Sequence, residues 1–276
     1  MKIYNTLSGI LLENNHKWFR LSDFDFDALI NDDHLFEKLT QLTRTLNTVE
    51  VNLTSEQIKA PIQSQELWAC GVTYLRSKIG RQEESKVAGG SDFYAKVYDA
   101  ERPEVFFKAT AHRVVGHGAK VTIREDSSWD VPEPELTLVV TSSGKIVGYT
   151  IGNDMSSRSI EGENPLYLPQ AKTYDACAAL GPCIYVSNEA LAKTTEIRMQ
   201  INRDNVPVFS GNVSLGQMKR SPEELVSWVY KACSFPKGCL IMTGTGIVPG
   251  ADFTLQPGDT ILIEIDGIGS LENSVR

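Results

Sequence analysis

One segment decides the fold: residues 128–182, SWDVPEPELTLVVTSSGKIVGYTIGNDMSSRSIEGENPLYLPQAKTYDACAALGP. It holds two apolar runs, ELTLVV and KIVGYTIGN, which the polar residues 141–144 separate, and this pattern predicts an antiparallel β-hairpin. Similar short runs, bounded by Gly, Pro, Asn or Asp, follow one another outside the segment: ELWACGV, KVTIRE, TEIRMQIN, CLIMTGT and DTILIEIDG. GPCIYV, residues 181–186, begins at the end of the segment and is another such run. The chain beyond residue 64 is therefore expected to be mainly β.

The predicted hairpin brings three carboxylates together. Glu133 and Glu135 are two residues apart at the start of a strand, so their side chains leave the same face. Reflection of the hairpin about residue 143 places Asp154 opposite Pro132, beside Glu133. Carboxylates this close repel one another, and a hard divalent cation would neutralise them. The alternative is a solvated acidic strand end in which raised pKa values absorb the repulsion.

Two cations follow the acidic residues. Arg158 comes four residues after Asp154, and Lys172 lies in the run PLYLPQAKTYD. An isolated Arg or Lys is normally a surface cation. Beside an inward-facing acidic cluster, each is also a candidate for clamping an anion or transferring a proton.

The first sixty residues have a different pattern. LSGILL and HKWFRL read as a hairpin with a polar turn at residues 13–15, and apolar residues at helical spacing predict a helix over residues 33–46. We therefore place a small N-terminal α+β domain at residues 1–64 and a larger domain at residues 65–276.

Two more segments have local signals. The run from Ser221 to Ala232 begins with an N-cap serine, a proline and two acids, which predicts a helix. Residues 80–92, GRQEESKVAGGSD, are polar and read as a mobile lid or a solvated loop.

Composition limits the function classes. The 276 residues are 41% hydrophobic and 22% charged, which excludes collagen, disorder and a coiled coil. The net charge of -8 argues against a nucleic-acid surface. No apolar run is long enough to span a membrane, and the N-terminus has no signal-peptide pattern. The five cysteines have no zinc-site spacing and are expected to be free thiols. These features favour a cytoplasmic enzyme or binding protein.

Several motifs together resemble the fumarylacetoacetate hydrolase family. They occur in the family's order over residues 70–276: CGVTY, RPEVFFKAT, PEPEL, GYTIGNDMSSR, QAKTYD, MTGTG and LQPGDTILIEIDGIGSLENSV. The resemblance implies the family's mixed β-sandwich or β-roll, with a small N-terminal α+β domain attached. It also implies a homo-oligomer, either a dimer or a tetramer.

The resemblance assigns roles to residues of three kinds: metal ligands, a catalytic lysine and substrate contacts. The metal, Mg²⁺ or Mn²⁺, is implied at Glu133, Glu135 and Asp154, the catalytic role at Lys172, and the substrate contacts at Arg158, Thr245 and Tyr74.

One departure from the family pattern concerns the base. Hydrolases of the family commonly carry Asn-Tyr-x-x-His, whose histidine activates the attacking water. Here Ser77 stands at the position of that histidine. Serine is not a base at neutral pH, so hydrolysis of a carbon–carbon bond is not expected.

The run EGENPLYLPQAK, residues 161–172, resembles the sugar-acid branch of the family. This implies dehydration of a 2-keto-3-deoxy sugar acid, as from 2-keto-3-deoxy-D-arabinonate to 2,5-dioxopentanoate. Lys172 would take a C3 proton and Glu104 would protonate the leaving C4 hydroxyl; otherwise Glu104 is a surface acid paired with Arg102 or Lys108. The alternatives are an acylpyruvate hydrolase, an oxaloacetate decarboxylase and a non-catalytic protein that binds 2-keto acids.

Overall fold

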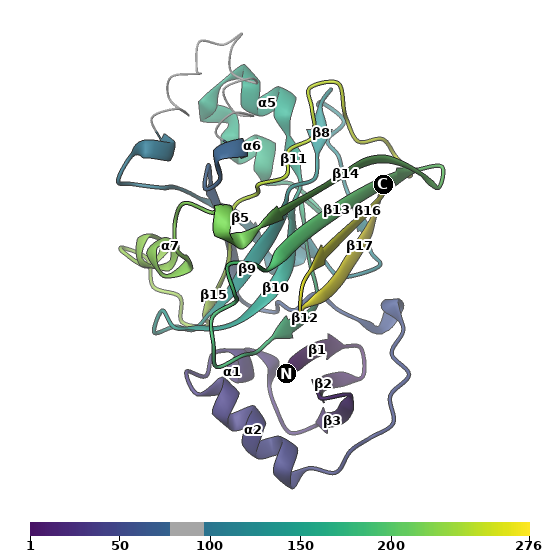
Figure 1. Cartoon of the computed structure of the whole chain (residues 1–276), viewed down its shortest axis with the longest axis vertical. Helices are drawn as coiled ribbons and strands as arrows, with labels where there is room; N and C mark the ends of the chain where they lie inside the picture. Colours follow the sequence, from purple (N-terminus) through teal and green to yellow (C-terminus); the bar gives the residue numbers. More distant parts are fainter. Residues whose placement is uncertain (78–96) are drawn as a thin grey trace.

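Two β-sheets packed face to face form most of the molecule (Figure 1). The structure is a computed structural model and describes residues 1–77 and 97–276. The large sheet consists, in spatial order, of β3 (Lys17–Leu21), β2 (Gly9–Asn14), β1 (Lys2–Thr6), β12 (Ala178–Tyr185), β10 (Ile146–Asp154), β9 (Pro134–Val140), β15 (Cys239–Met242), β4 (Glu66–Gly71) and β5 (Glu104–Thr110), with β6 (Val114–Val115) beside β12.

The other strands form a smaller sheet and a short pair. The smaller sheet runs β14 (Val206–Ser214), β13 (Glu196–Arg203), β16 (Thr260–Ile265), β17 (Gly269–Val275) and β7 (Lys120–Val121). The pair is β11 (Ser156–Ser157) and β8 (Asp130–Val131). Most pairings are antiparallel, while β15–β4, β12–β6 and β17–β7 are parallel. The expected α+β fold with mainly β, mixed sheets is confirmed.

Helices are short and lie outside the sheets. The α-helices are α1 (Phe26–Ile30), α2 (Leu35–Thr45), α5 (Arg158–Glu163), α6 (Leu168–Lys172) and α7 (Pro222–Val229). The 3₁₀ turns are η1 (Ser55–Gln57), η2 (Ala111–Arg113), η3 (Pro165–Tyr167) and η4 (Leu215–Gln217). None of the described helices is both long and apolar enough to cross a membrane.

The alternation of side chains along the central strands builds two hydrophobic cores. On β9, Leu136 and Leu138 belong to the core between the two sheets. The same core contains Ile197 and Ile201 of β13. Val139, which points the other way on β9, belongs to the second core. Both faces of β9 are therefore buried. This packing fixes the strand at whose start the two glutamates stand.

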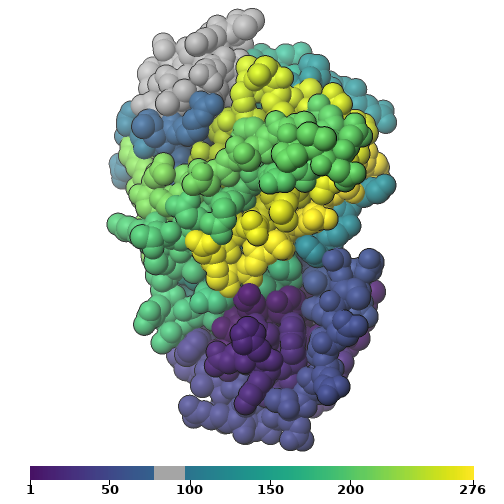
Figure 2. All heavy atoms as spheres, turned by 45° about the vertical axis from the view of Figure 1, so that its right-hand side comes forward, coloured from purple at the N-terminus to yellow at the C-terminus, as the bar shows by residue number. Residues whose placement is uncertain are grey.

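The N-terminal residues form a lobe on the large sheet, drawn in purple and blue in Figure 2. Strand β1 pairs with β12, so that the N-terminal hairpin continues the sheet of the larger part. Leu29 of α1 and Leu39 of α2 pack in the second core with Ile184 of β12. The domain boundary after residue 64 stays a prediction.

The structure agrees with the local predictions in most details. Helix α2 lies within the range expected for it, and the side chain of Ser221 caps α7 by accepting a hydrogen bond from the Glu224 amide. The N-terminal turn is shorter than expected: it consists of Asn15 and His16, both with positive φ, as in a tight two-residue hairpin. The segment 80–92 lies outside the described residues.

Candidate active site and metal centre

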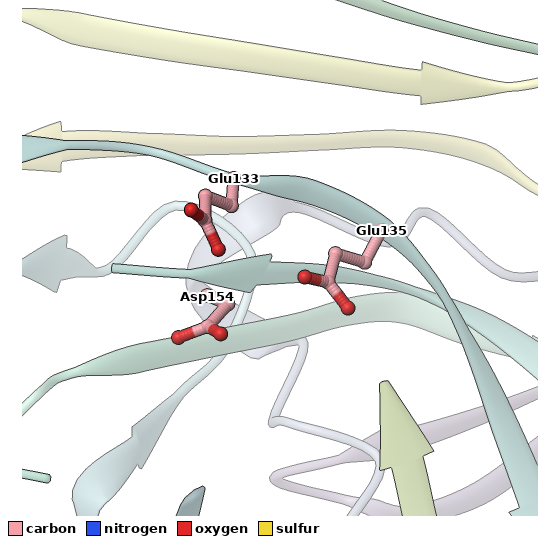
Figure 3. Close-up of side chains that lie close together, drawn as sticks. All are labelled: Glu133, Glu135 and Asp154. Carbon is pink, nitrogen blue, oxygen red and sulfur yellow. The ribbon is translucent and has the colours of Figure 1, made fainter. Parts of the chain in front are cut away.

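The hairpin of β9 and β10 brings the three carboxylates together (Figure 3). Asn153 pairs with Pro134, and the amide of Asp154 donates to the Glu133 carbonyl at 2.9 Å. Asp154 therefore lies opposite Glu133 and not opposite Pro132 as expected, because an irregularity between Ile146 and Gly148 shifts the register by one residue. One oxygen from each carboxylate lies within 4.8 Å of the others.

All three carboxylates are buried, which excludes a solvated acidic strand end. Glu133, Glu135 and Asp154 are 5%, 2% and 1% exposed. Burial, together with the negative charges of Asp154 and Glu133, raises the pKa of Glu135 well above its usual range. The only contact that stabilises its charge at hydrogen-bond distance, among the described residues, is the amide of Gly244, which donates to Glu135 Oε2 at 2.6 Å. Of the three carboxylates, Glu135 is therefore the one whose negative charge a bound cation would stabilise most.

Lys172 lies directly on the acidic cluster. Its Nζ atom donates to Glu133 Oε2 at 2.7 Å, to Asp154 Oδ2 at 3.0 Å and to the Ser156 hydroxyl at 2.6 Å. The side chain is 1% exposed, so the ammonium group is a buried component of the site and not a surface cation. Helix α6 ends at Lys172 and places it there.

Arg158 is the second predicted cation, and the structure also buries it. Its guanidinium donates to Glu133 Oε1, and its Nε lies 3.7 Å from Glu161 Oε2. Arg158 and Glu161 belong to the same helix, α5, and are both 2% exposed.

Sequence reasoning missed two charged members of the cluster. Lys108, considered only as a surface partner of Glu104, is fully buried and its Nζ lies 2.5 Å from Asp154 Oδ1. Burial alone would raise the pKa of Asp154, but the positive charges of Lys108 and Lys172 outweigh it and lower that pKa. Glu161 lies 3.7 Å from Lys172. The available signal for Lys108 was a single lysine inside an apolar strand run, EVFFKAT.

The charges of the cluster are close to balance. Glu161 and the three converging carboxylates face three cations: Lys108, Arg158 and Lys172. One negative charge is in excess, and a divalent cation would turn it into one positive charge. Such a site would attract a small carboxylate ion. The carboxylate oxygen atoms of this cluster are hard ligands, they are buried close together, and their negative charge is not fully neutralised. Such a set of atoms fits Mg²⁺ or Mn²⁺.

A small pocket opens onto the carboxylates and contains most of the predicted site residues. It is lined by Cys70, Gly71, Val72, Ser77, Phe106, Glu133, Glu135, Asp154, Arg158, Lys172, Gly244 and Thr245. The Thr245 hydroxyl is held by the backbone of Ile247, to which it donates and from which it accepts at 3.1 Å.

Glu104 lies against the pocket wall. Gly71 and Glu104 pair across β4 and β5, and a Cβ atom on Gly71 would overlap the Glu104 carboxylate. A side chain at position 71 would therefore force the Glu104 carboxylate to move. Tyr74, by contrast, is 1% exposed in the core between the sheets, so a substrate contact by Tyr74 stays a prediction.

Ser77 lines the pocket but is engaged by the backbone. Its hydroxyl donates to the Tyr74 carbonyl at 2.7 Å and accepts from the Tyr74 amide at 3.2 Å. No histidine of the described residues lines the pocket. The position where hydrolases carry their base therefore holds a serine that stabilises a local turn.

Comparisons with known proteins show which proteins this chain is similar to. The sequence model described as Fumarylacetoacetate (FAA) hydrolase C-terminal matches residues 81–276. A probable 2-keto-3-deoxyxylonate dehydratase of Haloferax volcanii is 47% identical over 236 residues, which are 85% of this chain and 80% of that protein. The 2-dehydro-3-deoxy-D-arabinonate dehydratase of Saccharolobus solfataricus is 38% identical over 98% of this chain and 92% of its own.

A solved structure is similar over the whole chain. It is a 2-keto-3-deoxy-D-arabinonate dehydratase complexed with magnesium and 2,5-dioxopentanoate, and the TM-score is 0.84 at 34% identity. The similarity covers 100% of this chain and 99% of that one.

Proposed function

This chain belongs to the fumarylacetoacetate hydrolase family, and from that membership and its site we propose that it is a hydro-lyase acting on 2-keto-3-deoxy pentonates. The proposed reaction converts 2-keto-3-deoxy-D-arabinonate into 2,5-dioxopentanoate and water. The observation that carries the proposal is the buried lysine, Lys172, which hydrogen-bonds to Glu133 and Asp154, two of the three carboxylates that fit a divalent metal.

We propose Glu133, Glu135 and Asp154 as the ligands of Mg²⁺ or Mn²⁺. When bound, the ion would polarise the keto group of the substrate and make its C3 protons more acidic. Arg158, which lines the same pocket, is suited to bind the substrate carboxylate.

The protein's own groups supply the proton transfers. Lys172 Nζ faces the pocket and is the candidate acceptor of the C3 proton. It would accept the proton as a neutral amine, the form that a divalent cation bound beside it would favour. Glu104, behind Gly71, is the candidate donor to the C4 hydroxyl, which leaves as water. A proton then shifts from C5 to C3, and the resulting C4–C5 enol tautomerises to the aldehyde of 2,5-dioxopentanoate.

The absence of a histidine base from the described pocket favours dehydration over hydrolysis. A hydrolase must activate a water molecule, whereas Ser77 is occupied by the Tyr74 backbone. A dehydratase needs only an acceptor for the C3 proton and a donor for the leaving hydroxyl. Lys172 and Glu104 are the candidates for these two roles.

An activity screen of the enzyme, treated with EDTA or supplied with metal, tests the proposal. Activity on 2-keto-3-deoxy pentonates should disappear with EDTA and return with Mg²⁺ or Mn²⁺. Acylpyruvates and oxaloacetate in the same screen represent the hydrolase and the decarboxylase. Full activity in metal-stripped enzyme, or turnover of acylpyruvates alone, would contradict it.

We also propose that the chain forms a homo-oligomer, a dimer or a tetramer, because closed symmetry is the rule for oligomers of one chain. Light scattering should give a multiple of the 30.5 kDa chain mass. A single 30.5 kDa species at micromolar concentration would contradict this.

A further inference from the structure

Lys108 is a buried cation of the site that the proposed reaction does not use. It lies on β5, where the pairing with β4 shifts: Leu67 faces Ala109 and Trp68 faces Phe107, so that Lys108 is the extra residue of a β-bulge. Bulges redirect a side chain out of the regular alternation of a strand and are common beside active sites.

The ammonium group of Lys108 joins three elements. It lies 2.5 Å from Asp154 Oδ1 on β10, and it donates to the carbonyl of Met155 at 2.8 Å and to that of Lys172 at 2.5 Å. These three acceptors match the three hydrogens of an ammonium group. The Lys172 carbonyl belongs to the last residue of α6, where no helical amide is left to pair with it.

We propose that Lys108 is a positioning residue that holds the backbone of Lys172 at a fixed place relative to the proposed metal ligand Asp154. This inference rests on the proposed function, in which Lys172 accepts a proton. Lys108 does not line the pocket in the part of the chain that the structure describes, so it acts through Lys172 and not on the substrate.

The short helix explains why the backbone of Lys172 needs the hydrogen bond from Lys108. Helix α6 has only five residues, and such a short helix does not fix its last residue by itself. The Nζ atom of Lys172 must nevertheless reach Glu133, Asp154 and Ser156 together. A displacement of about 1 Å in a reacting group can cost about 100-fold in rate.

A double-mutant cycle with Lys108→Met and Lys172→Met tests the proposal at saturating Mg²⁺. The readouts are kcat, KM and the exchange of the substrate's C3 protons in D₂O. Lys108→Met should lower kcat and C3 exchange about 100-fold and leave KM within about threefold. In the Lys172→Met background, Lys108→Met should cause no further loss, since its effect passes through Lys172.

Arg203→Met is the matched control outside the site. Arg203 also pairs with a buried carboxylate, Asp259 at 2.8 Å, and with a backbone carbonyl, that of Thr254 at 2.9 Å. This variant should lose thermal stability and keep wild-type kcat. Losses that multiply in the double variant, or a kcat loss in the control equal to that of Lys108→Met, would overturn the proposal.

Two further measurements keep the test decisive. If Lys108→Met does not fold, Lys108→Gln replaces it in the double-mutant cycle. Glutamine is uncharged, and its side chain is shorter than that of lysine. A crystal structure of the folded variant should show Lys172 Nζ displaced from Asp154, and an unmoved Lys172 would overturn the proposal whatever the substrate. Wild-type enzyme that forms no aldehyde from any 2-keto-3-deoxy pentonate would instead contradict the proposed function.

Discussion

Glu135→Gln should have opposite effects on the metal-free and the metal-bound protein. Glu135 is 2% exposed, and no lysine or arginine of residues 1–77 and 97–276 forms an ion pair with it. Its neighbours Glu133 and Asp154 each offer an oxygen within 4.8 Å. Glutamine keeps the shape and the hydrogen bond from Gly244 but removes the charge.

The magnitude follows from the distances. At an effective dielectric constant of about 20, two negative charges 4.8 Å apart repel each other by about 3.5 kcal/mol. The nearby lysines offset part of this repulsion. We therefore expect Glu135→Gln to stabilise the metal-free protein by about 2 kcal/mol, which raises Tm by about 4–8 °C.

The same substitution should remove the stabilisation that the metal provides. Mg²⁺ at 100 times its Kd stabilises a protein by about 2.7 kcal/mol, equal to about 5–10 °C for a chain of this size. Two carboxylates hold the ion poorly, so Glu135→Gln should show almost no shift with Mg²⁺ and no activity at ordinary metal concentrations.

The pH dependence of the metal-free protein gives an independent check. The pKa of Glu135 is raised in the folded state, so between its ordinary value and the raised value the unfolded chain binds fewer protons. The stability of the wild type should therefore fall as pH rises above about 4.5, and this part of the fall should be absent in Glu135→Gln.

Differential scanning calorimetry with and without Mg²⁺ measures all three effects. Asp259→Asn is the control, because Asp259 is equally buried but paired with Arg203. It should lower Tm and keep the Mg²⁺ shift. A metal-free Glu135→Gln protein that is less stable than the wild type and keeps the Mg²⁺ shift would show that Glu135 is not a metal ligand.

Two more substitutions probe the proton-transfer groups. Lys172→Ala should lower kcat by about 10²–10⁴-fold, as expected for loss of a positioned acid–base group, while calorimetric titration still shows Mg²⁺ binding; unchanged kcat would exclude Lys172 as the proton acceptor. Gly71→Ala should displace Glu104 and lower kcat at nearly unchanged Mg²⁺ affinity, since its Cβ overlaps the Glu104 carboxylate. Full activity in Gly71→Ala would show that Glu104 is not the donor.

Local patterns predicted the part of the site that one hairpin builds. The spacing of Glu133 and Glu135 placed both on one face, and the turn at residues 141–144 brought Asp154 back to them. The exact register was wrong by one residue, because the pairing of β10 with β9 shifts between Ile146 and Gly148.

Contacts between distant segments were beyond sequence reasoning. Lys108 is recognisable as a member of the site only once β5, β10 and α6 are packed together. The same holds for the pairing of β1 with β12, which joins residues separated by most of the chain. The sequence offered Lys172 as a candidate and the family resemblance gave it a catalytic role, but no local pattern predicts its hydrogen bonds to Glu133 and Asp154.

The most direct test of the account is proton NMR of 2-keto-3-deoxy-D-arabinonate incubated in D₂O with the purified enzyme and Mg²⁺. We expect the C4 proton signal of the sugar acid to disappear, deuterium to enter C3 and the aldehyde signal of 2,5-dioxopentanoate to appear. None of these changes should occur with EDTA. Efficient cleavage of an acylpyruvate by the same enzyme, with no aldehyde formed from the sugar acid, would contradict it.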